Sequence, residues 1–371
     1  MKRIHALLTA VTLVLGVATG GFAADTIKLG VAGPHSGDLA PYGIPAMKAA
    51  QLVVKKINAT GGVLGKQVEL LIQDDQCKPE IATNTATKLV TEGADVVLGH
   101  ICSGATKAAL GIYKDAKVPV MSPSATNPPL TQSGDYPNFF RTIASDDMQA
   151  KMAVDFAINT LGVKKIAVLH DKGDYGKGFA EFAKKFIEES GKAEVVLFEG
   201  ITPGAINYDS IVGKIRRDKA EALVFGGYHP EASKLVSSMK RKRLKVAFIS
   251  DDGVKDDSFV KVAGVAAEGA YMTGPRDLSS IPLNATATSE FKTEYGTDPG
   301  AFFQEGYSAA LALLNAIEQA GSTDYDAVVK ALQTKYVETP VGTIKFDDRG
   351  DAEGVGFSVY QVENGNFKEL K

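Results

Sequence analysis

The chain has 371 residues, of which 44% are hydrophobic and 23% are charged. This is the composition of an ordinary globular protein, and the length predicts two domains of typical size. The formal net charge of −3 is spread along the chain without a block of like charge, so nucleic acid and a charged membrane surface are not expected as partners. The one short basic run, residues 240–243, ends a predicted helix, where it complements the helix dipole.

Residues 1–23 have the three parts of a secretory signal peptide. Lys2 and Arg3 give the basic start, an apolar stretch covers residues 6–17, and Gly21 and Ala23 give the small-x-small pattern of a cleavage site. A membrane span takes about 20 apolar residues, so this stretch is too short for an anchor. We therefore predict cleavage after Ala23 and export of the remaining chain.

From residue 26 onward, short apolar runs alternate with amphipathic segments. Strands are predicted at 26–33, 67–75, 94–100 and 118–123, with helices at 45–58, 80–93 and 103–116 between them. The alternation restarts after residue 141, with strands at 164–171, 193–200, 221–227, 245–250 and 268–274 and helices at 147–161, 176–190, 208–218 and from residue 230. Helices at 285–295, 304–320 and 324–334 follow, then a strand at 343–346 and a hairpin at 357–370 that turns at Asn364-Gly365.

This order of elements predicts the fold class. Two successive runs of strand–helix units indicate an α/β protein with two doubly wound lobes, each on a parallel sheet. Because helices cover both faces of such a sheet, its strands are apolar throughout, as they are at 96–98 and 166–169. No low-complexity linker separates the lobes, so we expect the chain to cross between them in short extended segments.

The chain has only two cysteines, Cys77 and Cys102. In an exported protein such a pair favours a disulfide, which here would close a loop of 26 residues, counted from 77 to 102. A loop of this size stabilises the fold by roughly 3–4 kcal/mol. Two free buried thiols are the alternative. No metal site and no cofactor are expected, since the five histidines have no useful ligand spacing.

Two strand-to-helix corners in the first half carry small and hydroxyl residues. Ser103 stands where a helix N-cap is expected, and Ser124, Ala125 and Thr126 follow the next strand. Ligands of open α/β sheets bind beyond the carboxyl ends of the strands, where helix N-termini attract anions. The two corners could together hold a carboxylate. The alternative is a plain N-cap and two ordinary turns.

The second half offers aromatic and acidic residues at equivalent corners. Tyr175 and Tyr228 each follow a predicted strand, and Asp251 and Asp252 end another. A carboxylate at this position could pair with an ammonium group, whereas the alternative for each residue is a solvated loop position.

Enzymatic activity is not expected. The best catalytic set would join Ser103 or Ser124 to His170 and Asp171, but neither serine lies in a G-x-S-x-G elbow. The glycines of residues 173–178 do not follow the G-x-G-x-x-G order of a dinucleotide site.

The chain resembles the periplasmic leucine/isoleucine/valine-binding proteins, the solute receptors of bacterial branched-chain amino-acid ABC transporters. The similarity covers nearly all of the mature chain, and the matching stretches are GGVLGKQVELLIQDDQCKPEIA, VVLGHICSGATKAA, PSATNPPLT, IAVLHDKGDYGKG and GGYHPE. The resemblance implies a type I periplasmic binding protein with a three-segment hinge. It places lobe 1 at residues 24–144 with 276–350, and lobe 2 at 145–275 with 351–371.

The resemblance also implies a role for each matching residue. Ser103 and Thr126 would bind the amino-acid carboxylate, with Thr126 also touching the ammonium, and a backbone carbonyl at Ser124 would accept from the ammonium. Tyr42, Tyr175 and Tyr228 match the family's pocket aromatics. Cys77 and Cys102 match the family disulfide.

One departure concerns the ammonium site. Asp252 stands where the family pattern has glutamate, and Gln304 and Glu305 replace apolar and hydroxyl residues. A free amino acid is therefore the predicted ligand, branched-chain or related, with a longer or a γ-amino acid as alternatives. The expected partner of this monomer is an ABC transporter permease; the alternative is a sensory receptor that presents its ligand to a membrane sensor.

Overall fold

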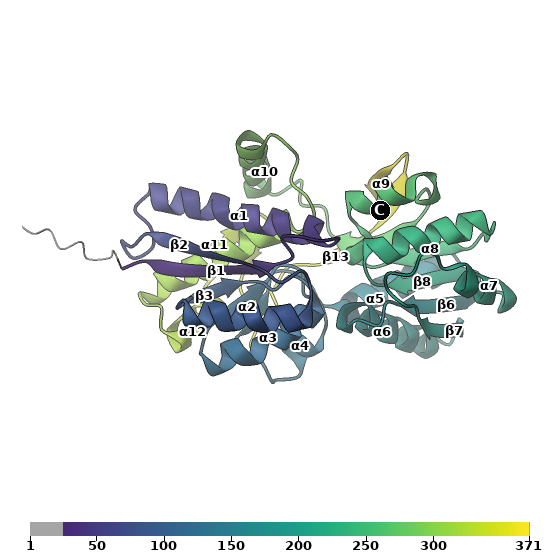
Figure 1. Cartoon of the computed structure of the whole chain (residues 1–371), viewed down its shortest axis with the longest axis horizontal. Helices are drawn as coiled ribbons and strands as arrows, with labels where there is room; N and C mark the ends of the chain where they lie inside the picture. Colours follow the sequence, from purple (N-terminus) through teal and green to yellow (C-terminus); the bar gives the residue numbers. More distant parts are fainter. Residues whose placement is uncertain (1–24, 371) are drawn as a thin grey trace, which may run out of the picture.

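The computed structural model describes residues 25–370, so the predicted signal peptide lies outside the described residues. Two lobes lie side by side, each built on its own β-sheet (Figure 1). Within residues 25–370, no helix has the length and apolar character needed to cross a membrane.

The first sheet has five parallel strands in the order β2-β1-β3-β4-β5. They are β1 (Ile27–Gly33), β2 (Val68–Asp74), β3 (Val96–Leu98), β4 (Val120–Ser122) and β5 (Phe139–Arg141). One face packs against α1 (Ala40–Ala59), α10 (Pro282–Tyr295), α11 (Phe303–Ala320) and α12 (Tyr325–Thr334), which are followed by the hairpin of β11 (Val337–Thr339) and β12 (Gly342–Ile344). The other face packs against α2 (Pro79–Thr91), α3 (Ser103–Asp115) and α4 (Pro129–Gln132). Because both faces are covered, β3 and β4 are buried throughout.

The second sheet has seven strands in the order β14-β13-β10-β9-β8-β6-β7. Its parallel part is β6 (Lys165–His170), β7 (Glu194–Gly200), β8 (Ala222–Gly226), β9 (Ala247–Ser250) and β10 (Tyr271–Pro275). The predicted hairpin is confirmed: β13 (Phe357–Glu363) and β14 (Asn366–Glu369) are antiparallel, and the turn residues Asn364 and Gly365 both have positive φ.

Helices cover both faces of the second sheet too. α5 (Asp146–Asp155), which continues as a π-helical turn η1 (Phe156–Thr160), and α6 (Asp174–Ser190) pack on one face. α7 (Asp209–Arg217), α8 (His229–Arg241) and α9 (Asp257–Ala263) pack on the other, with short 3₁₀ turns η2 (Asp252–Val254) and η3 (Gly264–Ala266). The prediction of two doubly wound lobes is therefore confirmed.

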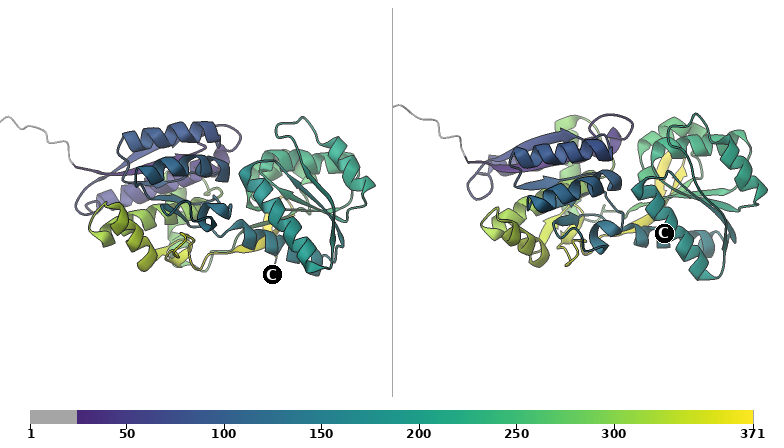
Figure 2. Two further views of the ribbon diagram at one scale, coloured as in Figure 1. Left: turned by 90° about the horizontal axis from the view of Figure 1, so that it is seen from below. Right: turned by 60° about the horizontal axis from the view of Figure 1, so that its bottom comes forward.

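The chain passes between the sheets three times. It crosses from β5 to α5, from β10 to α10 and from β12 to β13, and Figure 2 shows the lobes joined by these segments on one side. The core of the first lobe accordingly combines side chains of β1 and α1 with side chains of α11 and β12. The connections form the predicted three-segment hinge.

Some local details differ from the prediction. Helix α1 begins at Ala40 rather than at residue 45, because Pro41 already fills the first turn, where a missing N–H leaves no bond unmade, and the helix continues through Pro45. The three residues of β5 were not predicted as a strand: β3 and β4 are as short, but they are marked by apolar runs, whereas β5 ends in the charged Arg141.

Candidate functional site

A small cavity lies between the lobes and is lined by both. The first lobe contributes Tyr42, Ile101, Cys102, Ser124 and Phe302, and the second contributes Tyr175, Tyr228, Asp252 and Gly253. Its free volume is about 10 Å³, which is about one water-sized sphere. The lobes are thus fully drawn together, and a ligand the size of an amino acid can enter only when they separate.

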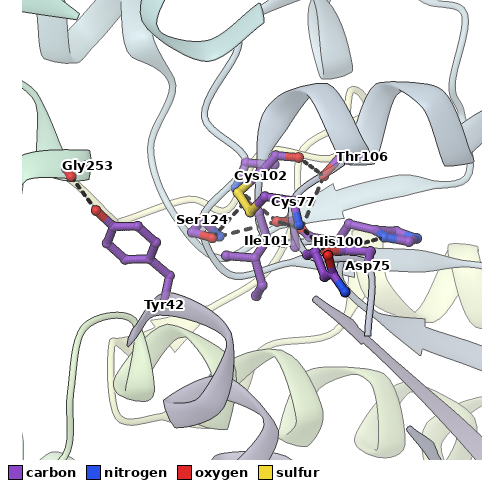
Figure 3. Close-up of a disulfide and its surroundings, with 12 residues drawn as sticks. Tyr42, Asp75, Cys77, His100, Ile101, Cys102, Thr106, Ser124 and Gly253 are labelled. Carbon is purple, nitrogen blue, oxygen red and sulfur yellow. Dashed lines mark hydrogen bonds and ion pairs between the residues drawn. A yellow bond between two sulfur atoms is a disulfide. The ribbon is translucent and has the colours of Figure 1, made fainter. Parts of the chain in front are cut away.

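Direct contacts hold the two lobes in this closed arrangement. The Tyr42 hydroxyl donates a hydrogen bond of 2.5 Å to the carbonyl oxygen of Gly253, as Figure 3 shows. At the other rim, Lys107 Nζ lies 2.8 Å from the carboxylate of Asp174, and the Asn127 amide donates to the Asp174 carbonyl. Residues from the N-terminal regions of α1 and α3 therefore reach across to the second lobe.

Ser103 is not the N-cap of α3, which corrects the sequence-based expectation. Cys102 occupies the N-cap position, and Ser103 is the first helical residue. The first backbone bond of the helix runs from Thr106 N to Cys102 O, at 2.9 Å, so the N–H groups before Thr106 have no partner within the helix. The buried Ser103 hydroxyl accepts from Asn127 N at 3.3 Å. The helix N-terminus and this hydroxyl form a corner suited to an anion.

The second corner follows β4 and is held by its own side chains. The Ser124 hydroxyl donates to the Ile101 carbonyl at 2.8 Å, and the Ser122 hydroxyl accepts from Ala125 N at 2.9 Å. The Thr126 hydroxyl, by contrast, is buried and has no hydrogen-bond partner. A ligand is the natural partner for such a group, because an unsatisfied buried polar atom is costly.

Arg141 fixes the backbone of this corner. Its guanidinium, wholly buried at the end of β5, donates to the carbonyls of Ala125 at 3.3 Å and Asn127 at 3.1 Å. It also donates to Thr131 Oγ1 at 2.7 Å and to Asp351 Oδ1 at 2.5 Å. The planar fork of arginine serves all four acceptors at once, which a lysine cannot do.

Three buried carboxyl groups gather on the opposite side of the cleft. Asp146, Asp251 and Asp252 are all at most 2% exposed, and both oxygens of Asp146, Oδ1 of Asp251 and Oδ2 of Asp252 have no hydrogen-bond partner. Burial raises the pKa of each of the three, and the charge of Asp252 raises the pKa of Asp146 and Asp251 further. Of the three acids, Asp252 lines the cavity, and Asp146 and Asp251 are close enough to it for their charges to interact. A cation that donates several hydrogen bonds would satisfy their unpaired oxygens.

Thr126 and Gln149 lie beside these carboxyls. Burial raises the pKa of Asp146, and the nearby Thr126 hydroxyl lowers it in part. Burial likewise raises the pKa of Asp252, and the nearby Gln149 amide lowers it in part. Neither contact has the geometry of a made hydrogen bond, and both polar atoms of the Gln149 amide remain unpaired. The Thr126 hydroxyl of the first lobe and the Gln149 amide of α5 therefore both lie close to the carboxyl groups of Asp146 and Asp252.

Aromatic rings form the rest of the wall. The Tyr175 hydroxyl donates to Asp252 Oδ1 at 2.5 Å and accepts from Gly253 N at 2.9 Å. Its ring centroid lies 5.1 Å from that of Tyr228, which lies 5.9 Å from that of Tyr42. Phe302 completes the row at 5.8 Å from Tyr42, and its φ of +60° is an uncommon backbone conformation for a bulky residue.

A disulfide and a buried contact between Asp75 and His100 support the first corner. Cys77 and Cys102 are bonded, with Cα atoms 5.5 Å apart (Figure 3). The carboxylate of Asp75 accepts from Cys77 N at 2.7 Å and lies 2.6 Å from His100 Nδ1, and all of these groups are within a few residues of the two cysteines. The loop that carries Cys77 is thus attached twice to the segment that ends in Ser103.

Sequence reasoning missed several groups at this site. Asp146 and Gln149 look like ordinary residues of a first helical turn, and Phe302 looks like a core residue, so only their position in the fold marks them. Gln304 and Glu305 do not line the cavity itself but a wider opening beside it, which shares Asp252 and Phe302 with the cavity. No group of three or more metal-ligating side chains is found among residues 25–370.

Two hinged α/β lobes that close over a cavity, with an anion-binding corner on one side and unpaired carboxyl groups on the other, define a two-lobed solute-binding protein. The chain belongs to the periplasmic binding protein family, whose model matches residues 26–366.

Known proteins agree with this assignment over nearly the full length. The chain is 38% identical over 354 residues to a leucine-, isoleucine-, valine-, threonine- and alanine-binding protein from Pseudomonas aeruginosa, covering 95% of this chain and 94% of the relative. It is 25% identical to the leucine binding protein LivK from Thermotoga maritima, with a TM-score of 0.87 and coverage of 93% and 98%. It is 29% identical to the transporter substrate binding protein LivJ from Streptococcus pneumoniae, solved with isoleucine, with a TM-score of 0.81 and coverage of 93% and 100%. These relatives are binding proteins, so the chain is not an enzyme.

Proposed function

We propose that the protein is the periplasmic solute-binding component of an amino-acid ABC transport system and that it binds a free amino acid between its lobes. The observation that carries the proposal is the set of unpaired carboxyl oxygens on Asp146, Asp251 and Asp252, together with the N-terminus of α3, whose first N–H groups have no partner within the helix. A molecule that carries both an ammonium and a carboxylate satisfies both sets. The names of the relatives, which bind branched-chain amino acids, support this ligand class.

The first lobe would hold the carboxylate. Ser103 would donate its hydroxyl and backbone N–H, and Thr126 would donate its unpaired hydroxyl. Charge-assisted hydrogen bonds of this kind are about twice as strong as neutral ones. Ser124 and Ala125 would contribute backbone groups, since the Ser124 hydroxyl is already committed to Ile101.

The acids would hold the ammonium. Asp252 is the residue carried over from the family pattern, and its Oδ2 is free while Tyr175 occupies Oδ1. Aspartate is one methylene shorter than the family's glutamate, and we infer that Asp146 and Gln149 make up for the shorter reach. An ammonium has three N–H donors, so it can bind acceptors from Asp146, Asp252 and Thr126 together.

The ligand's side chain would face the aromatic wall. Tyr42, Tyr228, Phe302 and Ile101 present mainly carbon to the cavity, and the bond between Tyr42 and Gly253 would close it to water. An apolar side chain of moderate size fits such a lining.

The remaining assignments are part of the same proposal. Residues 1–23 would direct export and be removed after Ala23, the disulfide of Cys77 and Cys102 would form in the periplasm, and the monomer would deliver its ligand to a membrane permease. The lobes would comprise residues 24–144 with 276–350, and 145–275 with 351–371. Each of these boundaries falls in one of the three stretches between the sheets, which supports the division.

Calorimetry of the purified protein against the twenty amino acids and common γ-amino acids tests the proposal. We expect at least one branched-chain or related amino acid to bind. Two matched controls for leucine lack one charge each, 4-methylpentanoate without the ammonium and 3-methylbutylamine without the carboxylate. Each should bind at least about 10- to 150-fold more weakly, the equivalent of a lost charged hydrogen bond of about 1.5–3 kcal/mol. Failure of every amino acid to bind would refute the proposal.

A further inference from the structure

His100 lies behind the ligand cavity, in the short segment between β3 and α3. Its ring is wholly buried, and both ring nitrogens have partners. Nδ1 lies 2.6 Å from the carboxylate of Asp75, as Figure 3 shows, and Nε2 lies 3.1 Å from the hydroxyl of Tyr113. Asp75 and Tyr113 are wholly buried as well, so the three side chains form a hydrogen-bonded chain away from water.

This chain holds the ring in one orientation. An ionised carboxylate can only accept hydrogen bonds, so Nδ1 of a neutral ring carries the proton and donates to Asp75, while Nε2 accepts from the Tyr113 hydroxyl. Asp75 is fixed in turn, because its other carboxylate oxygen accepts from Cys77 N at 2.7 Å and its own N–H donates to the Gly33 carbonyl at 3.0 Å. The ring therefore cannot turn without breaking a hydrogen bond at each end.

The backbone carbonyl of His100 joins the two corners that face the cleft. It accepts from the Thr106 hydroxyl, in the first turn of α3, at 3.1 Å and from the Ser122 hydroxyl, at the end of β4, at 2.5 Å. The Ser122 oxygen accepts in turn from Ala125 N at 2.9 Å, and the carbonyl after that of His100 accepts from the Ser124 hydroxyl at 2.8 Å. The N-terminus of α3 and the turn after β4 are thus both hydrogen-bonded to one peptide segment.

We propose that His100 is the positioning residue of the carboxylate site, and that its ring, held between Asp75 and Tyr113, fixes the carbonyl group that keeps the two corners in register. This inference rests on the proposed function. A carboxylate that is bound by donors from two elements needs both at the right distance at once, so the support behind those donors decides its affinity. The disulfide supplies only part of this support, because it joins Cys77 to Cys102 and makes no bond to the turn after β4.

The position of His100 also predicts which half of the ligand depends on it. Both corners that its segment holds belong to the first lobe, which would bind the carboxylate. Asp252, which would bind the ammonium, lies in η2 of the second lobe, and its carboxylate is fixed there by Tyr175. Loss of the ring's hydrogen bonds should therefore weaken the contacts to the carboxylate and leave the contact between Asp252 and the ammonium intact.

The test is calorimetry with L-leucine and with 3-methylbutylamine, which lacks the carboxylate. His100→Leu keeps much of the bulk of the ring but none of its hydrogen bonds, so it should weaken leucine binding about tenfold, the equivalent of about 1.4 kcal/mol. The affinity for 3-methylbutylamine should stay within about twofold of the wild type. His100→Asn, whose amide can donate to Asp75 in place of Nδ1, should restore part of the leucine affinity. An equal loss for both ligands, or no loss for leucine, overturns the proposal.

A milder variant tests the same chain if His100→Leu does not fold. Tyr113→Phe removes only the hydroxyl that donates to Nε2, and it should weaken leucine binding about 2- to 5-fold, as expected for one neutral hydrogen bond. Tyr307→Phe is the matched control: Tyr307 is also buried in the first lobe, but its hydroxyl lies 3.2 Å from Lys56 Nζ and 3.2 Å from Glu290, away from both corners. Equal leucine affinities for the two variants would contradict the inference.

Failure of the proposed function gives a different result. In that case leucine does not bind the wild type, and the positioning role is decided by NMR spectroscopy of the ligand-free proteins. Tyr113→Phe should shift the backbone amide resonances of both corners, those of Ser103 and Ala125 among them, whereas Tyr307→Phe should leave them in place. Unchanged amide resonances at both corners in Tyr113→Phe would show that the chain of side chains does not position them.

Discussion

Replacement of Arg141 by lysine should destabilise the protein strongly, although both residues carry one positive charge. The guanidinium of Arg141 is fully buried and serves Asp351, Thr131 and the carbonyls of Ala125 and Asn127. A lysine offers a single point charge and leaves some of these acceptors unpaired. Each buried acceptor that lysine leaves unpaired costs about 1–3 kcal/mol, and we take about 3 kcal/mol in all because Asp351 is 20% exposed.

Thermal unfolding measures this effect. For lobes of this size, 1 kcal/mol shifts Tm by about 2–4 °C, so Arg141→Lys should lower Tm by about 6–12 °C. Arg349→Lys is the matched control, since Arg349 is exposed and pairs only with Asp347, and its Tm should stay close to that of the wild type. A Tm for Arg141→Lys within about 2 °C of the wild type would show that the guanidinium network contributes little, and the reasoning would be wrong.

Three further predictions concern single groups. Asp252→Asn should weaken leucine binding about 10- to 150-fold by calorimetry. The control Asp257→Asn, at the exposed start of α9, should bind leucine like the wild type. If Asp252→Asn also binds like the wild type, Asp252 is not part of the site. Asp171 has a pKa raised to about 6 by burial. A buried acid whose pKa is raised on folding destabilises the protein as pH climbs from the acid's ordinary pKa to the raised one. Asp171→Asn should therefore stabilise the fold at pH 8 by up to about 3 kcal/mol, but not at pH 4, as measured by urea unfolding. Equal gains at both pH values would contradict this. Cys77→Ser with Cys102→Ser should lower the free energy of unfolding by roughly 3–4 kcal/mol, and peptide mapping that finds both thiols free in the exported wild type would refute the disulfide.

The fold was predictable from the sequence because its strands are buried on both faces. Apolar runs such as residues 96–98 and 222–225 alternate with helices of clear periodicity, and that alternation has few solutions other than doubly wound sheets. Some short elements were not predictable. The three-residue strand β5 and the short helix α9 gain their stability from neighbours that are remote in sequence, and local patterns do not record such contacts.

The site was predictable only in part. Tyr42, Ser124, Tyr175, Tyr228 and Asp252 follow strands or begin helices at the expected edge, and the structure gathers them around one cavity. Asp146 could not be found in this way, because an acid in the first turn of a helix is common for reasons of the helix dipole alone. Its unpaired oxygens distinguish it from an ordinary first-turn acid, and they are seen only in the folded structure.

The threefold crossing between the lobes has a consequence for biosynthesis. The first lobe's core combines Ile27 and Leu29 of β1 with Leu313 of α11 and Ile344 of β12, and the second sheet needs β13 beside β10. A nascent chain that emerges from its N-terminus therefore cannot complete either lobe until β12 and β13 have been made. Translocation across a membrane in an unfolded state requires such a delay. The hinge that lets the lobes move would then also postpone folding until after export.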